Sequence, residues 1–126
     1  MSGAAPIARL LAATGIALLA TGCAAPKPQA LYGWESYQPQ VYEYLKTSGE
    51  ADPQAQIAEL EQSGERIQAG GAALPPGYRA HLGMLYAKAG QTDKSAEQLT
   101  AEKTQFPEST TFMDFLLQTL SGKARQ

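Results

Sequence analysis

Few side chains in this sequence could carry out chemistry, and the two most reactive types occur once each. Cys23 is the only cysteine and His81 is the only histidine. A single thiol cannot form an internal disulfide, and no second thiol, histidine or close carboxylate pair accompanies His81 to complete a zinc site or a nucleophilic site. We therefore predict no catalytic residue, no metal site and no cofactor, and a structural or solvated role for His81.

The carboxylates offer one alternative, because Glu102, Glu108 and Asp114 could lie close enough for paired acid–base catalysis. Charges at this density more often line a solvated helix face. The pair Gly70-Gly71 is not followed by the Lys-Ser or Lys-Thr of a phosphate-binding loop, and a flexible connection between helices explains it. The sequence thus argues against an enzyme, and an enzyme of unknown type is a remote alternative.

The first 22 residues have the order of a secretory signal peptide, which must be set aside before the fold is considered. Arg9 supplies a positive charge, an apolar run continues to Ala20, and small residues precede Cys23. The run is about a dozen residues long, whereas a helix that spans a bilayer needs about 20. We predict that residues 1–22 are removed by cleavage before Cys23.

The residues Leu19-Ala20-Thr21-Gly22-Cys23 resemble the bacterial lipobox, at which a lipid is attached to the cysteine thiol. The sequence departs from that pattern at Ala20, where Leu is usual but Ala is tolerated. An ordinary signal peptide followed by a chance cysteine is the alternative. Because Ala24 stands where inner-membrane lipoproteins have Asp, the resemblance implies an outer-membrane lipoprotein on the periplasmic face. The acyl chains of such lipoproteins give lasting attachment to the membrane.

The chain from Cys23 onward has room for one domain with a modest core. Residues 23–31 contain Pro26 and Pro28 and show no apolar periodicity, which predicts an extended tether behind the acylated Cys23. We assign residues 32–121 to a helical domain and residues 122–126 to a polar tail. Without Arg9 the chain has nine basic and twelve acidic side chains, and this net charge of about −3 argues against nucleic acid as a partner.

Apolar residues in the domain recur with helical spacing, and no long stretch alternates as a strand would. Capping residues, prolines and glycines separate the apolar stripes from one another. The sequence thus predicts an all-α fold of about five helices. In chain order, the starting signals and buried stripes are Ser36 with Tyr37, Val41, Tyr44 and Leu45; Asp52-Pro53 with Ile57, Leu60, Gly64 and Ile67; Pro75-Pro76-Gly77 with Tyr78, Leu82, Leu85 and Tyr86, ending at Gly90; Thr92-Asp93 with Ala96, Leu99 and Phe106, ending at Pro107; and Ser109 or Thr110 with Phe112, Met113, Phe115, Leu116, Leu117 and Leu120.

The third and fourth helices together resemble a tetratricopeptide repeat, a helix pair whose small residues allow close approach. The pattern departs at Glu102, where the repeat usually has Ala, so either this helix rotates slightly or the Glu102 carboxylate finds a partner at the edge of the pair. The resemblance implies tetratricopeptide-like hairpins, with residues 34–68 as an atypical first repeat and the last helix as a cap. An unrelated helical hairpin is the alternative. The matching residues are Leu82-Gly83, Tyr86, Gly90, Ser95, Leu99 and Pro107.

The layout from Tyr32 to about Leu120 also resembles a family of small proteobacterial lipoproteins known only as a domain of unknown function. Genes of that family commonly lie beside genes for a lipoprotein like the curli secretion channel and for another small lipoprotein. The resemblance therefore implies an envelope protein as partner, with the channel-like lipoprotein as a candidate. The residues that carry it are Tyr32 and Trp34, Leu74-Pro75-Pro76-Gly77, Ala80-His81-Leu82-Gly83-Met84-Leu85-Tyr86, Glu102-Lys103, and Phe106-Pro107-Glu108-Ser109.

Trp and Tyr serve both as core anchors and as binding hot spots, and we assign most of the aromatic cluster to the core. Tyr32 and Trp34 precede the first helix, so we expect these two at the surface. Together with Phe112 and Phe115 on the apolar last helix, they are the residues expected to contact a partner. The sequence predicts a non-catalytic interaction or assembly module of an envelope complex, with a structural lipoprotein that has no specific partner as the alternative.

Overall fold

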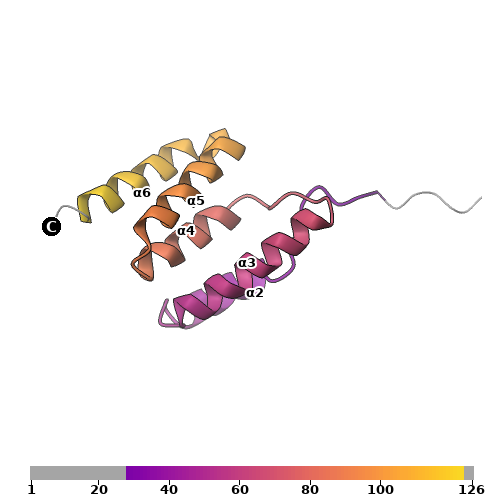
Figure 1. The fold of residues 1–126 in the computed structure, drawn as a ribbon, viewed down its shortest axis with the longest axis horizontal. Coiled ribbons are helices and arrows are strands. Elements are labelled where there is room, and N and C mark those ends of the chain that lie inside the picture. The colour runs from indigo at the N-terminus through magenta and orange to yellow at the C-terminus, as the bar shows by residue number, and fades with distance from the viewer. Residues whose placement is uncertain (1–27, 124–126) are drawn as a thin grey trace, which may run out of the picture.

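The computed structural model describes residues 28–123, and these residues fold into five α-helices and one short 3₁₀ turn (Figure 1). The all-α fold predicted from the sequence is confirmed. The predicted signal peptide, residues 1–22, and Cys23 lie outside the described residues. The helices are α2 (Tyr37–Lys46), α3 (Pro53–Ala69), α4 (Tyr78–Lys88), α5 (Thr92–Gln105) and α6 (Thr110–Lys123), and the 3₁₀ turn η1 (Pro107–Ser109) connects the last two.

Each helix packs against its neighbour in the chain, from α2 against α3 through to α5 against α6. Figure 1 shows the resulting row of helices, with α6 at one edge and the α2–α3 pair at the other. No helix within residues 28–123 has both the length and the hydropathy needed to cross a membrane.

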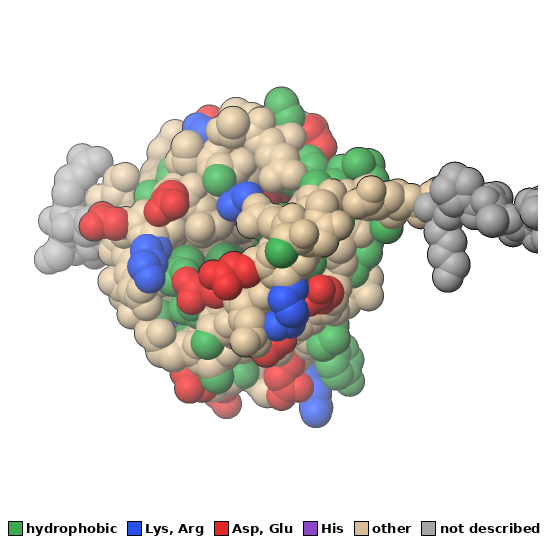
Figure 2. Space-filling model, turned by 45° about the vertical axis from the view of Figure 1, so that its right-hand side comes forward, with side chains coloured by type: hydrophobic (Ala, Val, Ile, Leu, Met, Phe, Trp, Pro, Cys, Tyr) green, Lys and Arg blue, Asp and Glu red, His purple; other side chains and the backbone are tan. Residues whose placement is uncertain are grey.

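The core lies where α3 meets α4, and the stripes predicted for these two helices are the residues that fill it. Tyr37 and Tyr44 of α2 pack against its edge. Figure 2 shows that charged side chains of both signs are interspersed on the face in view, with no basic patch of the kind that binds nucleic acid. The buried core residues are Ile57, Leu60, Ile67, Leu74, Tyr78, Leu82, Leu85 and Tyr86.

Most helix boundaries follow the local signals in the sequence. The Asp52 side chain accepts a hydrogen bond from the amide of Gln54 and caps α3, and Pro53 is its first residue. Gly90 has a φ of 77° and follows the end of α4, as expected for a left-handed helix terminus. Ser36 precedes α2 as predicted, but its side chain makes no capping hydrogen bond, so that part of the prediction is wrong.

The crossing of α4 and α5 is close at Gly83, as the repeat pattern predicts. A Cβ atom at this position would lie 3.1 Å from the Cγ and Cδ2 atoms of Leu99 and 3.3 Å from the backbone oxygen of Ser95. Both Leu99 and Ser95 are buried. The absence of a side chain at Gly83 therefore lets the two helix backbones approach each other.

The segment before α2 is attached to the loop between α3 and α4, which the sequence does not predict. The amide of Gly33 donates to the carbonyl of Ala73 at 3.0 Å, and the amide of Ala73 donates to the carbonyl of Leu31 at 3.0 Å. A Cβ atom on Gly33 would lie 2.5 Å from the Ile67 side chain, so the segment lies tightly on α3. At the other end, α6 continues to Lys123, two residues into the predicted polar tail.

Candidate functional site

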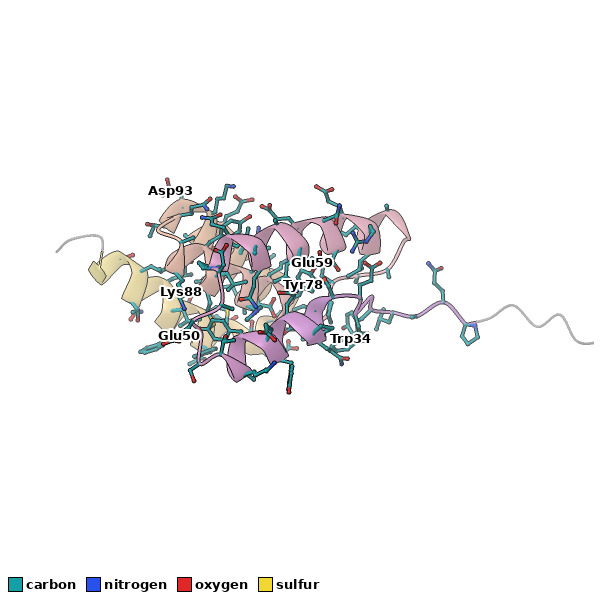
Figure 3. The ribbon with its side chains drawn as sticks, turned by 90° about the horizontal axis from the view of Figure 1, so that it is seen from below. Trp34, Glu50, Glu59, Tyr78, Lys88 and Asp93 are labelled. Atoms are coloured by element: carbon teal, nitrogen blue, oxygen red, sulfur yellow. The ribbon has the colours of Figure 1, made fainter. Side chains whose placement is uncertain are left out.

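One hollow of the domain is a groove formed by alternate helices of the row. Its volume is about 400 Å³, and it lies between α2, α4 and α6. A second hollow, of about 140 Å³ and mostly apolar, adjoins it between α4, α5 and α6 and shares Met84, Ala87 and Leu120 with it. Figure 3 shows the helices in two layers, with α3 and α5 on one side and α2 and α6 on the other. The groove is lined by Tyr44 of α2, by Met84, Ala87 and Lys88 of α4, and by Leu120 of α6.

Among the described residues, Lys88 is the only charged one that lines this groove. Its ammonium nitrogen lies 5.6 Å from the centre of the Tyr44 ring, in a cation–π arrangement. Met84 offers an exposed, flexible thioether to the same space, and Leu120 closes it from α6. The groove therefore suits apolar side chains next to a negatively charged group.

The exposed surface of α6 carries two aromatic rings. Phe112 and Phe115 are 57% and 61% exposed, and their rings stack with centroids 6.5 Å apart. Met113, between them in sequence, is buried and holds the helix to the domain. The structure thus brings together two of the four residues that the sequence offered as partner contacts.

The other two expected contacts, Tyr32 and Trp34, differ in how much of the side chain is exposed. Trp34 is 44% exposed, as expected, and its ring stacks on Tyr37 at 6.2 Å. Tyr32 is half-buried, with its ring 6.2 Å from that of Phe106, so the expectation that it lies free at the surface is wrong. The reason is the backbone pairing of residues 31–33 with the loop before α4, which turns Tyr32 toward the end of α5.

Met84 and Lys88 line the groove but were not among the residues selected from the sequence. Met84 stands between Gly83 and Leu85, off the buried stripe of its helix. An apolar residue beside a buried stripe is the signal that a helix has a second apolar face. In addition, stacked helical repeats place alternate helices on the same surface of the domain, so the repeat resemblance is a second signal for a groove between α2, α4 and α6.

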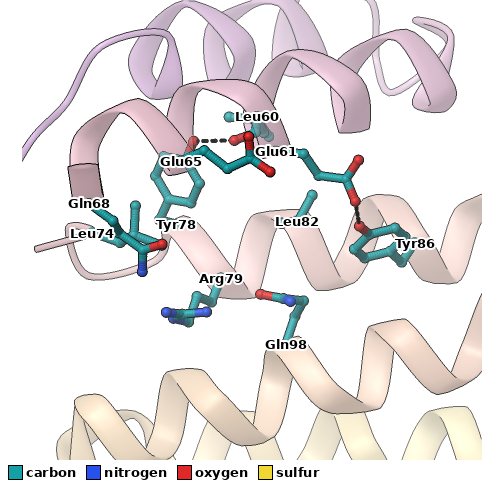
Figure 4. A pocket seen from close by; sticks show the side chains of 11 residues that line it. Leu60, Glu61, Glu65, Gln68, Leu74, Tyr78, Arg79, Leu82, Tyr86 and Gln98 are labelled. Carbon is teal, nitrogen blue, oxygen red and sulfur yellow. Dashed lines mark hydrogen bonds between the residues drawn. The ribbon is translucent and has the colours of Figure 1, made fainter.

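A separate cavity of about 320 Å³ lies on the other side of the α3–α4 pair (Figure 4). Leu74 and Leu82 are among its apolar lining residues, and Glu61, Glu65 and Arg79 are its charged ones. Its described lining residues include no Ser, Cys, His or Lys, and the hydroxyl groups that it holds are those of Tyr78 and Tyr86.

Two tyrosines of this cavity are hydrogen-bond donors with fixed roles. The Tyr86 hydroxyl donates to the Glu61 carboxylate, and burial together with that carboxylate raises the pKa of Tyr86. The Tyr78 hydroxyl donates to the Leu60 carbonyl at 2.6 Å, and burial raises its pKa as well. Both phenols remain protonated at neutral pH and connect α4 to α3.

His81 is buried between aromatic rings of α2. The centroids of the Tyr44 and Tyr37 rings lie 5.4 Å and 6.3 Å from that of its imidazole. Burial lowers the pKa of His81 below its usual value, which favours the neutral form. Among residues 28–123, no three His, Cys, Asp or Glu side chains lie together in a way that could hold a metal ion.

The three carboxylates considered for paired catalysis have separate environments. Asp114 forms an ion pair with Lys103 at 2.6 Å, between α6 and α5. Glu108 is exposed in the 3₁₀ turn η1. Glu102 is only 2% exposed, and its Oε1 atom accepts a hydrogen bond of 2.6 Å from the backbone amide of Gly77. Of the two alternatives left open for Glu102, the structure shows that the carboxylate has found a partner.

Glu102 takes the place of a capping side chain for α4. The residue at the N-cap of this helix is Gly77, which has no side chain to accept an amide hydrogen bond. Its φ is 88°, and a Cβ there would lie 2.6 Å from the Tyr37 hydroxyl, so a larger residue does not fit. The carboxylate of Glu102 reaches across from α5 and satisfies the amide at the positive end of the helix dipole.

We expect Glu102→Ala to destabilise the domain by about 1–3 kcal/mol, because it leaves the part-buried amide of Gly77 without an acceptor. Glu102→Gln should restore most of that stability, since an amide oxygen can still accept the hydrogen bond. Urea denaturation of the chain that lacks residues 1–23 measures both. Glu97→Ala, an exposed change on the same helix, is the control, and equal midpoints for the two alanine variants would contradict this role of Glu102.

Comparison with known families places most of the described chain in one of them. Residues 31–116 match the model of the family described as a domain of unknown function, DUF4810. The match runs from the segment before α2 into α6 and includes every groove residue except Leu120. No curated protein and no solved structure matches the chain. Because the family match covers more than half of the sequence, the protein belongs to the DUF4810 family.

Proposed function

We propose that this protein is a lipid-anchored lipoprotein of the outer membrane, on the periplasmic face, whose groove holds another envelope protein and so assists assembly of a membrane complex. The observation that carries the proposal is the groove between α2, α4 and α6. A protein that only occupied the membrane surface would have no need of an open, partly apolar hollow. The proposed role involves no reaction.

The chemistry of the groove indicates the kind of segment that it would hold. Met84, Ala87 and Leu120 favour apolar side chains, and the Lys88 ammonium favours an acidic residue or a chain-terminal carboxylate beside them. Phe112 and Phe115 lie on the same last helix and offer a second contact of the aromatic type found at binding hot spots. The lipoprotein like the curli secretion channel, suggested by the family resemblance, is our candidate partner.

Site-specific crosslinking in living cells tests this function. We expect a photoreactive residue placed at Met84, in the groove, to capture one envelope protein reproducibly. The control places the same residue at Gln62, which is exposed on α3, and should not capture that protein. If position 84 captures only lipid and peptidoglycan, or the same neighbours as position 62, the groove holds no partner and the structural alternative is selected.

A further inference from the structure

Helix α2 has a second apolar face that points away from the domain. Tyr42 and Leu45 are 66% and 69% exposed, and with Val41 they line a shallow, almost entirely apolar hollow on the outside of the helix. Trp34, just before the helix, adds a large exposed ring next to Tyr37, which also lines this hollow. The sequence assigned Leu45 to the buried stripe, and that assignment is wrong, because α2 packs against the core through Tyr37 and Tyr44 instead.

This outer face of α2 begins where the chain leaves the domain toward its N-terminus. Figure 3 shows Trp34 at the end of α2 nearest to the departing chain, with α2 along the open lower side of the molecule. Leu31, also exposed, lies between the two. The apolar residues thus form one surface that starts near the N-terminal end of the described chain and continues along the helix.

The length of the tether determines how close this surface lies to the membrane. Leu31 stands eight positions after Cys23. An extended chain covers about 3.1 Å per residue, so these eight steps span roughly 25 Å. If Cys23 carries lipid, the end of α2 that bears Trp34 is therefore held within reach of the bilayer surface.

From this geometry we propose that the outer face of α2, formed by Leu31, Trp34, Val41, Tyr42 and Leu45, lies on the bilayer to which Cys23 is anchored. This inference rests on the lipid attachment in the proposed function. Trp and Tyr rings favour the headgroup level of a bilayer, and an apolar helix face lies in the same zone.

The charges on α2 do not oppose this contact. Glu43 and Lys46 form an ion pair at 3.9 Å, so these two charges cancel and add no net negative charge to the side chains of α2 near the bilayer. A weak attraction between α2 and the bilayer is sufficient. The short tether keeps the helix close to the membrane, so its effective concentration at the bilayer surface is high. The bilayer contact would also leave the groove and α6 available to a protein partner.

The single tryptophan makes the contact directly measurable. The lipidated protein, which begins at Cys23, is reconstituted into vesicles of phosphatidylethanolamine and phosphatidylglycerol that contain lipids brominated near the headgroup end of the acyl chain. We expect Trp34 fluorescence to shift to shorter wavelength and to be quenched by the brominated lipids. The variant Tyr42→Glu/Leu45→Glu places charges on the face at two exposed positions and should lose this quenching severalfold, with unchanged circular dichroism. The matched control Gln62→Glu/Thr100→Glu adds two charges at exposed positions of α3 and α5 and should keep the quenching.

Flotation of the same vesicles separates failure of the anchor from failure of the contact. Protein that floats with the vesicles but shows no quenching overturns the contact and leaves the lipid anchor intact. Protein that does not float overturns the anchor, and the contact with it. A third outcome is that Trp34 is shielded from a water-soluble quencher in native membranes but not in these vesicles. Trp34 is then covered by a protein, and this result also overturns the bilayer contact.

Discussion

Cys23→Ser should leave the protein entirely without lipid. Attachment of diacylglycerol at a lipobox forms a thioether, which requires the nucleophilic sulfur of a thiolate, and a serine hydroxyl does not replace it in that step. Because the chain has no other cysteine, no second thiol can take over. Metabolic labelling of cells with a fatty-acid analogue measures the effect, and we expect strong label on the wild-type protein and none on the variant.

A conservative change in the lipobox provides the control for that experiment. Thr21→Ser keeps a small residue two places before Cys23 and should retain the label. Label that persists on Cys23→Ser would show that the lipid is attached elsewhere. A wild-type protein without label would select the alternative of an ordinary signal peptide, and both the outer-membrane placement and the contact of α2 with the bilayer would then have to be abandoned.

The helices could be predicted because their signals are local in the sequence. The stripe Ile57, Leu60 and Ile67 is buried because residues three or four apart share a helix face, whatever packs on it. Asp52 caps α3 through an amide only two residues away. Such features depend only on residues that are close together in the chain, and they can therefore be predicted from the sequence.

The surfaces could not be predicted to the same degree because they depend on distant parts of the chain. Leu45 fits the stripe of α2 as well as Tyr44 does, and only the direction from which α3 and α4 approach decides which of them is covered. Tyr32 is half-buried because residues 31–33 pair with a loop about 40 residues later. Glu102 departs from the repeat pattern because its carboxylate accepts a hydrogen bond from Gly77, a residue 25 positions earlier in the chain.

The close crossing of α4 and α5 predicts a large loss of stability for Gly83→Leu. Even a Cβ atom here would lie 3.1 Å from Leu99 and 3.3 Å from the backbone of Ser95, so a complete leucine side chain must push the helices apart. Overpacking of this kind costs about 1–3 kcal/mol or more, and separation of the helices would also uncover Leu99. Leucine is a better helix former than glycine by up to about 1 kcal/mol, which offsets only part of the cost.

We therefore expect the thermal midpoint of the chain that lacks residues 1–23 to fall by roughly 10 °C, since 1 kcal/mol corresponds to about 4–8 °C in a domain of this size. Gly122→Leu is the matched control, because the same substitution on α6 meets no atom within 4 Å of the new Cβ. The control should melt at the wild-type temperature or slightly above it. If both variants melt together, the backbones of α4 and α5 do not meet at Gly83, and the repeat-like arrangement that places α2, α4 and α6 around one groove loses its main support.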